Sequence, residues 1–542
     1  MQELAPVDKE KRISPLQPIL PTHPGEALYW SRLYGSSRGL AIARAAAQRQ
    51  SPLLVIAADA RSVRRLEDEI RFYAPPGPKI SVLAFPDWEC LPYDALSPHP
   101  DIVSQRLLTL SQLPGLRAGV VLTSVATLMH RLPPLHYVAG YTLQLRTGDH
   151  LHIEDLRTQL VRAGYHSVSQ VMEPGEFAVR GGLIDLFPMG SVVPYRIDLF
   201  GDEIESLREF NPETQRSGRK LETIQLLPAR EFPTTPDAVQ FFRQSFRARF
   251  EGDPQKVALY RDVSRGVIPA GAEYYLPLFF SDTATFFDYF PATGVCIIDA
   301  NLADLARAFS LEAEERYQER CHDRSRPILK PRELFLSEDL LGQEIEKRQR
   351  IHLLAFKADE ERHFSAVTGQ NQALRAFDTL APPELAVDYR SEAPYRALLD
   401  YLRSYPGRIL LVAETLGRRE TLRGLLQDNG FAPQEVAHWE AFLASEARLA
   451  LTVAEIERGL LLADPALALI TEPQLYGERA AQRRRRAGVT ARDPEAIIKN
   501  LAELRIGDPV VHEDHGVGRY LGLQILDVGD GPTEFLALEY AG

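Results

Sequence analysis

The stretch that decides the organisation of this chain is residues 171–217, VMEPGEFAVRGGLIDLFPMGSVVPYRIDLFGDEIESLREFNPETQRS. It consists of short apolar runs separated by glycine and proline, a pattern typical of β-strands joined by tight turns. From Tyr195 to Leu199 apolar and polar residues alternate, as in a strand with one exposed face. We therefore predict a small, separate α+β domain over residues 141–228.

The residues before this domain have a different pattern. Val63, Leu66 and Ile70 recur at helical spacing with charged residues between them, which predicts a helix over residues 60–73. Buried strands are predicted by the apolar runs at residues 53–57 (LLVIA), 80–85 and 120–123 (VVLT). The strand-helix-strand order indicates an α/β domain, of which residues 20–140 are the first part.

The chain returns to the α/β pattern after the strand-rich domain. Residues 238–250 predict a helix, and the apolar run GVCIID at residues 294–299 predicts a strand that completes the first sheet. Residues 229–355 are therefore expected to be the second part of the same α/β domain. The strand-rich domain is expected to be an insertion into it.

Three further regions follow. Residues 382–475 predict a second α/β domain, with buried strands in GRILLVAET and ALALITEP and an amphipathic helix ending at Gly430. Residues 476–499 form an arginine-rich linker, and residues 500–542 predict a small β-barrel. Because the chain stops at LEYAG without an obvious closing strand, we expect the barrel to be incomplete and the chain to be cut from a longer protein. The predicted fold class is thus multidomain α/β and α+β.

Composition excludes several classes of protein. The chain has 542 residues, 45% of them hydrophobic and 25% charged, as expected of a globular multidomain protein. It has no apolar run near the roughly 18 residues that span a bilayer and no Cys-x-x-Cys pair, so we expect a cytoplasmic monomer without a membrane partner. The net charge of -12 disfavours general DNA binding. The basic run at residues 483–486 is interpreted as a solvated linker in preference to a phosphate contact.

A nucleotide-hydrolysing site is predicted to be degenerate. The glycine-containing turn at residues 34–41, YGSSRGLA, includes Gly35 and Gly39, but no lysine and hydroxyl follow to bind phosphates and magnesium. The strand at residues 294–299 ends in Asp299 without the glutamate that would orient the attacking water. Two independent halves of an ATPase site are missing, so we expect neither hydrolysis nor a bound cofactor in this chain.

No other catalytic or metal site is predicted. His512 and His515 lie three residues apart in a segment that predicts strand and turn, whereas two zinc-binding histidines on a helix are four apart. Scattered serine and histidine residues carry no triad geometry. We assign no catalytic residue and no metal ligand. Arg180, Arg196 and Phe200, by contrast, are the types of residue found in partner-binding patches, although a solvated strand face fits their spacing equally well.

Residues 171–217 closely resemble the inserted second domain of the repair protein UvrB, and more specifically that of bacterial transcription-repair coupling factors. Residues 87–107 are similar to the first UvrB-like domain of these factors and are too short for UvrB's DNA-gripping hairpin. Residues 273–302 resemble the strand that carries the second ATPase motif, here without its glutamate. Residues 500–523 resemble the start of the RNA-polymerase-interacting domain, a barrel similar to CarD regulators.

The resemblance implies partners for particular residues. Arg180, Arg196 and Phe200 match the positions through which coupling factors and UvrB bind UvrA. Leu526 matches the position that contacts the RNA polymerase β subunit. The resemblance also implies that the ATP-driven translocase, with ATP and magnesium and most of the DNA contacts, follows this segment. The chain is then a non-catalytic adaptor that recruits UvrA to polymerase stalled at DNA lesions. The alternatives are a UvrB-like ATPase or helicase, which needs the missing motifs, and a CarD-type transcription regulator.

Overall fold

The computed structural model describes residues 12–75, 80–354, 373–391 and 393–476, and the strands at 509–512, 516–527 and 532–539. These residues fall into two compact units, 1–481 and 482–542, each of which is described by itself.

The first sheet of the larger unit is seven-stranded and fully parallel, in the order β15-β1-β14-β13-β2-β4-β3. Every residue of the interior strand β2 is buried, as expected of a parallel sheet covered on both faces. Its strands are β1 (Ala27–Ser31), β2 (Pro52–Ala57), β3 (Val82–Ala84), β4 (Gly119–Ser124), β13 (Val295–Asp299), β14 (Gln349–Leu353) and β15 (Leu374–Ala376). The runs predicted as strands at 53–57, 80–85, 120–123 and 294–299 each contain or lie within a strand of this sheet, although at 80–85 only Val82–Ala84 is strand.

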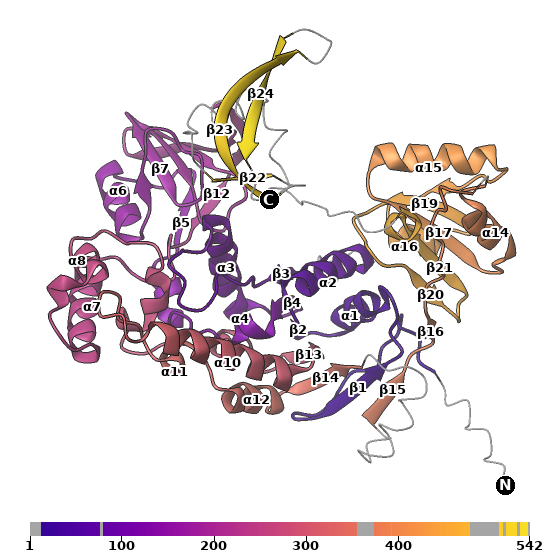
Figure 1. Cartoon of the computed structure of the whole chain (residues 1–542), viewed down its shortest axis with the longest axis horizontal. Coiled ribbons are helices and arrows are strands. Elements are labelled where there is room, and N and C mark those ends of the chain that lie inside the picture. Colours follow the sequence, from indigo (N-terminus) through magenta and orange to yellow (C-terminus); the bar gives the residue numbers. More distant parts are fainter. Residues whose placement is uncertain are drawn as a thin grey trace. The chain divides into compact units, whose positions relative to one another are not determined.

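Helices cover both faces of the first sheet (Figure 1). Helix α2 begins after Asp59, whose side chain accepts from the Ser62 N–H at 2.7 Å, and it buries the residues predicted to face the sheet. One face packs against α1 (Ser37–Gln48) and α2 (Ala60–Tyr73). The other packs against α3 (Pro100–Gln112), α4 (Val125–Met129), α10 (Leu302–Arg320) and α12 (Glu338–Glu346).

The strand-rich region is inserted between β4 and β13. Its main sheet has the order β11-β10-β9-β8-β7-β6, and a separate pair joins β5 to β12. Its elements are β5 (Leu143–Arg146), α6 (Ile153–Arg162), β6 (His166–Ser167), β7 (Glu176–Arg180), β8 (Leu183–Phe187), β9 (Tyr195–Phe200), β10 (Glu203–Phe210), β11 (Ser217–Leu221) and β12 (Thr223–Leu226). One sheet face, with Ile184, Ile197 and Leu207, joins the buried cluster beneath the first sheet.

The inserted region is therefore fixed to the first domain by a shared core. Gly190 fits closely at this joint, because a Cβ there would lie 2.8 Å from Leu227 and 3.3 Å from Leu108 of α3. Its N–H also donates to the Ser104 hydroxyl at 2.8 Å. After the insertion, an aromatic helical layer packs around Phe242. It contains α7 (Pro236–Arg249), α8 (Ala258–Ser264), a 3-10 helix (Ala272–Leu278) and α11 (Pro331–Leu334). Helix α9 (Phe286–Tyr289) packs instead into the cluster shared with the inserted sheet, and α5 (Leu135–Gly140) lies ahead of the insertion.

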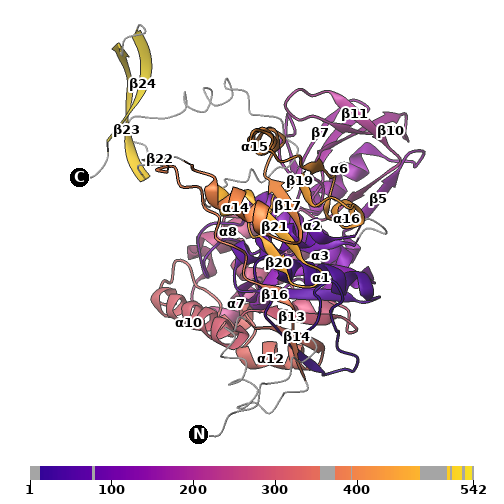
Figure 2. The ribbon, with the colours of Figure 1, turned by 90° about the vertical axis from the view of Figure 1, so that its right-hand side faces the viewer.

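A third sheet follows, in the order β16-β20-β21-β17-β19-β18. Its strands are β16 (Thr379–Leu380), β17 (Arg408–Ala413), β18 (Gln434–Glu435), β19 (Leu449–Val453), β20 (Leu460–Leu462) and β21 (Leu467–Thr471). Its helices are α14 (Arg396–Ser404), α15 (Leu416–Asp428), α16 (Trp439–Ala444) and α17 (Glu472–Tyr476). Figure 2 shows α16 beside α2 of the first domain, and ring contacts between Trp439 and Tyr73 join the two.

The smaller unit contains one antiparallel sheet within its described residues. Its strands are β22 (Pro509–His512), β23 (Gly516–Asp527) and β24 (Pro532–Glu539), with β23 in the middle. Leu526 lies in β23 and pairs with Thr533 of β24, but the surroundings of its side chain lie outside the description. The predicted arginine-rich linker, 476–499, also lies outside the described residues, apart from Tyr476.

Candidate functional site

The inserted sheet brings Arg180, Arg196 and Phe200 to one face. Arg196 pairs with Asp185 across β8 and β9, and Phe200 lies four residues further along β9, so the two share a side. Ala178 pairs with Asp185, which places Arg180 of β7 on that side as well. This face is opposite to the one that joins the core. Since one strand lies between β7 and β9, their backbones are roughly 10 Å apart.

Phe200 and Arg180 are the exposed members of this face. Phe200 exposes 79% of its surface at the end of β9, just before the Gly201–Asp202 turn into β10. Arg180 is also exposed, and its guanidinium donates to the Ser169 carbonyl at 2.5 Å. An exposed aromatic ring on a hydrogen-bonded sheet is a rigid apolar anchor for a partner.

Arg196 is held inside the fold more than the sequence suggests. Its Nε and Nη2 donate to the two oxygens of Asp185 at 2.6 and 2.9 Å, a bidentate ion pair. Asp185 is 1% exposed and the Arg196 side chain 14%. The hydrogen bonds to Asp185 raise the pKa of Arg196 further, so it is always charged. Arg196 therefore holds the two strands together, whereas Phe200 and Arg180 are the more exposed of the three predicted residues.

Two basic residues that the sequence did not single out belong to the same face. Arg208 of β10 pairs with Arg196, and Lys220 of β11 pairs with Arg208. Arg208 also donates to the Ser206 hydroxyl, which in turn donates to Asp198 at 2.6 Å. The face thus carries four basic side chains, of which Arg196 is paired with Asp185 and Arg208 lies 4.0 Å from Asp198. Only the strand register could have revealed Arg208 and Lys220.

The residues of the predicted degenerate nucleotide site come together at the carboxyl edge of the first sheet. Gly35 lies in the turn before α1, Gly39 in the first turn of that helix, and Asp299 at the end of β13. Asp299 accepts from the Arg38 guanidinium at 2.6 Å. Its pKa is raised by burial, and the charge of Arg38 opposes that shift. An arginine thus neutralises the acid that would otherwise attract a magnesium ion.

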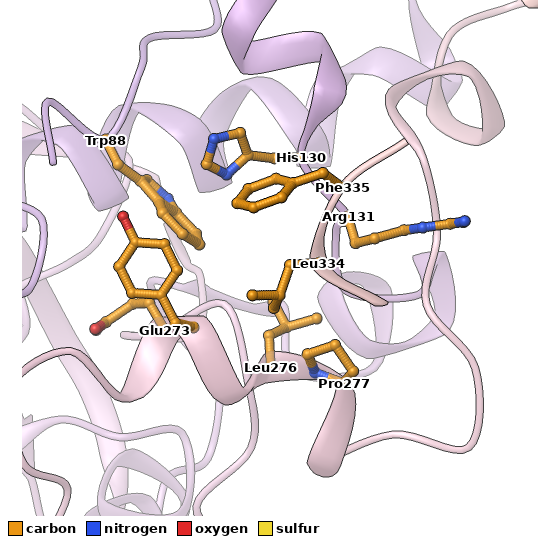
Figure 3. Close-up of a pocket in the computed structure, with 9 residues that line it drawn as sticks. Trp88, His130, Arg131, Glu273, Leu276, Pro277, Leu334 and Phe335 are labelled. Atoms are coloured by element: carbon orange, nitrogen blue, oxygen red, sulfur yellow. The ribbon is translucent and has the colours of Figure 1, made fainter. Parts of the chain in front are cut away.

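A small pocket elsewhere in the larger unit is lined largely by aromatic and apolar side chains. Figure 3 shows the rings of Trp88, His130 and Phe335 side by side on its wall, with the Arg131 side chain pointing away. The ring centroids lie 4.7 Å (Trp88 to His130) and 5.1 Å (His130 to Phe335) apart. Burial lowers the pKa of His130 to about 4, so the ring is neutral at pH 7. The pocket, at about 10 Å³, has room for one water at most.

The described part of the chain contains neither a metal-binding cluster nor a membrane-spanning helix. No group of three or more histidine, cysteine, aspartate or glutamate side chains there could hold a metal ion. None of the helices in that part is long and apolar enough to cross a membrane. Residues 513–515, which include part of the histidine-containing segment weighed above, lie outside the described residues.

Three family models match the chain at separate places. The UvrB interaction domain matches residues 143–232, the MFD D3 domain residues 401–475, and the CarD-like/TRCF RID domain residues 504–542. The chain is also 41% identical over 523 residues to the transcription-repair-coupling factor of Escherichia coli K12. The chain belongs to the transcription-repair-coupling factor family. The first model covers the whole inserted sheet, and therefore the face that carries Phe200.

Other relatives from this family extend the match. The transcription-repair-coupling factor of Haemophilus influenzae is 39% identical over 529 residues, and that of Myxococcus xanthus 30% identical over 548 residues. The alignments cover 96–97% of this chain but 44% of each relative, including the Escherichia coli protein. The chain thus spans less than half the length of these curated relatives.

Proposed function

We propose that this chain is the adaptor portion of a transcription-repair coupling factor, which recruits UvrA and docks on RNA polymerase stalled at DNA lesions. The exposed face of the inserted sheet binds UvrA through Phe200 and Arg180, and Arg196 holds that face in shape. The observation that carries this proposal is the exposure of Phe200 on a rigid sheet, within the region matched by the UvrB interaction domain.

The same proposal gives the remaining parts their roles. The β22–β24 sheet, with Leu526, contacts the polymerase β subunit, which agrees with the match to the CarD-like/TRCF RID domain. This segment does not hydrolyse ATP and holds no cofactor; the neutralised Asp299 supports this part. ATP, magnesium and most DNA contacts belong to the part of the full-length protein beyond this chain, and the protein acts in the cytoplasm as a monomer.

Calorimetric titration of UvrA into the purified chain tests the proposal. Phe200→Ala is expected to weaken binding by about 2 kcal/mol, roughly thirty-fold, because it removes the exposed aromatic anchor. Tyr389→Ala is the matched control: this ring is 71% exposed, but it lies far along the chain, ahead of α14.

The outcomes separate clearly. Equal losses in the two variants, or undiminished binding by Phe200→Ala, contradict the proposed face. Failure of the wild-type chain to bind UvrA contradicts the adaptor role of the chain. The whole chain is used because the inserted sheet shares its core with α3, so a fragment would expose apolar surface.

A further inference from the structure

The turn at residues 34–41 faces another part of the same chain. A Cβ added at Gly35 would lie 2.1 Å from the Gly459 carbonyl oxygen and 2.9 Å from Pro382, and both of these residues belong to the third-sheet region. Both distances are shorter than the non-bonded contacts that a real Cβ makes. The absence of a side chain at Gly35 is therefore required by the approach of the third domain, and no phosphate is needed to explain it.

The hydrogen-bonding groups of the turn are also engaged. The Ser36 N–H donates to the Gly459 carbonyl at 2.9 Å, and the Ser36 hydroxyl lies 3.2 Å from the same oxygen. The Tyr34 N–H donates to the hydroxyl of Thr379 in β16 at 3.2 Å. In a phosphate-binding loop, backbone N–H groups of this kind are the ones that point at the ligand. Here a backbone carbonyl oxygen of the third domain accepts the hydrogen bonds of Ser36, in the place that a phosphate oxygen would take.

A second residue fills the turn from within the first domain. A Cβ at Gly39 would lie 2.3 Å from the Cβ of Glu69 in α2 and 2.8 Å from its Oε2. The Glu69 side chain is 1% exposed, and Arg65 of the same helix lies 3.9 Å from its carboxyl. The charge of Arg458, next to Gly459, also acts on the Glu69 carboxyl. The space beside the start of α1 is thus taken by side chains of the protein.

The contact continues beyond the turn. The Trp439 ring of α16 packs edge-on against Tyr73 of α2 with centroids 5.1 Å apart, and Arg44 of α1 forms an ion pair with Glu440. Leu460 of β20 lies in the same buried cluster as Leu40 of α1. Apolar burial on both sides makes this a packed joint between the two domains.

We propose that the third α/β domain blocks the degenerate nucleotide turn, with residues 457–459 occupying the place where a nucleotide phosphate would bind. This assigns a role to a domain that the adaptor function leaves without one. The first domain uses its nucleotide edge to bind a segment of its own chain, which keeps nucleotides out and locks the two α/β domains together.

Hydrogen exchange followed by mass spectrometry on the whole chain tests this blocking contact. In Gly35→Ala the added methyl group collides with the Gly459 carbonyl. Exchange is therefore expected to rise at least about ten-fold in peptides covering residues 34–41 and 457–462, with β2 still protected. Gly25→Ala is the matched control. Gly25 has a positive φ of 75°, against 58° at Gly35, so both variants carry backbone strain, but the nearest atom to a Cβ at Gly25 is 3.9 Å away.

Three results would overturn the proposal. They are an equal response of residues 457–462 in both variants, rapid exchange of this segment in the wild-type chain, and protection of residues 34–41 on addition of millimolar MgATP. If Gly35→Ala does not fold, Glu440→Gln replaces it, because it removes the charge that pairs with Arg44 without adding atoms. It is expected to raise exchange of residues 436–443 and 457–462 several-fold; no change there contradicts the joint.

Discussion

The nucleotide turn and the face of the inserted sheet are opposite kinds of surface in one chain. Around the turn, three polar groups are directed into the protein. The Ser36 N–H donates to the Gly459 carbonyl, Glu69 fills the space beside Gly39, and Asp299 pairs with Arg38. On the inserted sheet, Phe200 and Arg180 point outward with the sheet behind them as support. The turn that was compared with a phosphate loop is thus filled by the protein itself, whereas the end of β9 is left open. The difference between the two places is therefore one of exposure and occupancy, which a motif alone does not show.

The largest expected effect concerns the joint that holds the open face in place. Arg106 of α3 and Glu231, just after the insertion, form an ion pair of two fully buried side chains, with Nε and Oε1 2.5 Å apart. Arg106→Ala leaves the Glu231 charge without its partner, so the free energy of unfolding should fall by about 3–5 kcal/mol in urea titrations. Arg219→Ala, which breaks an exposed pair with Glu209, should cost about 0.5 kcal/mol or less. Equal losses would contradict the burial argument.

A somewhat smaller loss is expected within the face itself. Arg196→Ala removes both donors to Asp185, which stays buried, and should lower the free energy of unfolding by about 3 kcal/mol. Arg208→Ala on the next strand is the control, since Arg208 lies 4.0 Å from a half-exposed Asp198. If Arg196→Ala weakens UvrA binding without any loss of stability, Arg196 is an outward contact and the assignment above is wrong.

The buried Glu69 beside the turn should make the free energy of unfolding depend on pH. Burial raises the pKa of Glu69 to about 8 from an ordinary value of 4.5. The folded state therefore holds this proton more tightly than the unfolded chain. The stability that Glu69 contributes is complete below pH 4.5 and is lost as pH rises through 8. Between pH 7 and pH 8 the loss is about 1 kcal/mol. Urea titrations at the two pH values measure it as the difference from Glu69→Gln, which lacks the titrating group. The same pH response in both proteins contradicts it.

The smallest effect should come from the exposed charge of the open face. Arg180→Ala is expected to weaken UvrA binding by about 0.5–1 kcal/mol, mainly through slower association, and to reduce its dependence on salt. Stopped-flow association at two salt concentrations measures this. Arg396→Ala, in the third domain, removes an arginine of 80% side-chain exposure as the control. An unchanged salt dependence in Arg180→Ala would place this arginine outside the interface.

Local pattern predicted the regular elements well. The helix predicted over residues 60–73 is α2, and the run at 53–57 lies in β2, because helical periodicity and a fully apolar run each have one dominant cause. The return of the chain to the first sheet at β13 was also visible. The grouping of Arg196 with Phe200 follows from strand alternation alone, since they are four residues apart.

Partners distant in sequence were beyond such reasoning. That Arg196 is bound by Asp185, and that Arg208 and Lys220 join its face, depends on strand register, which the sequence does not fix by itself. The sequence shows that Gly35 and Gly39 are not followed by the lysine and the hydroxyl residue of a phosphate loop. Only the structure shows what these glycines accommodate.

The sequence by itself thus determined the main helices and strands, the insertion and the family, because these depend on local periodicity and on residue identity in order. The tertiary structure decided which surfaces are open and which are filled. Gly459 reaches Ser36 from 423 positions along the chain, and Glu69 reaches Gly39 from the next helix. Such close approaches are set by how whole domains pack, and packing at this range leaves no local pattern in the sequence.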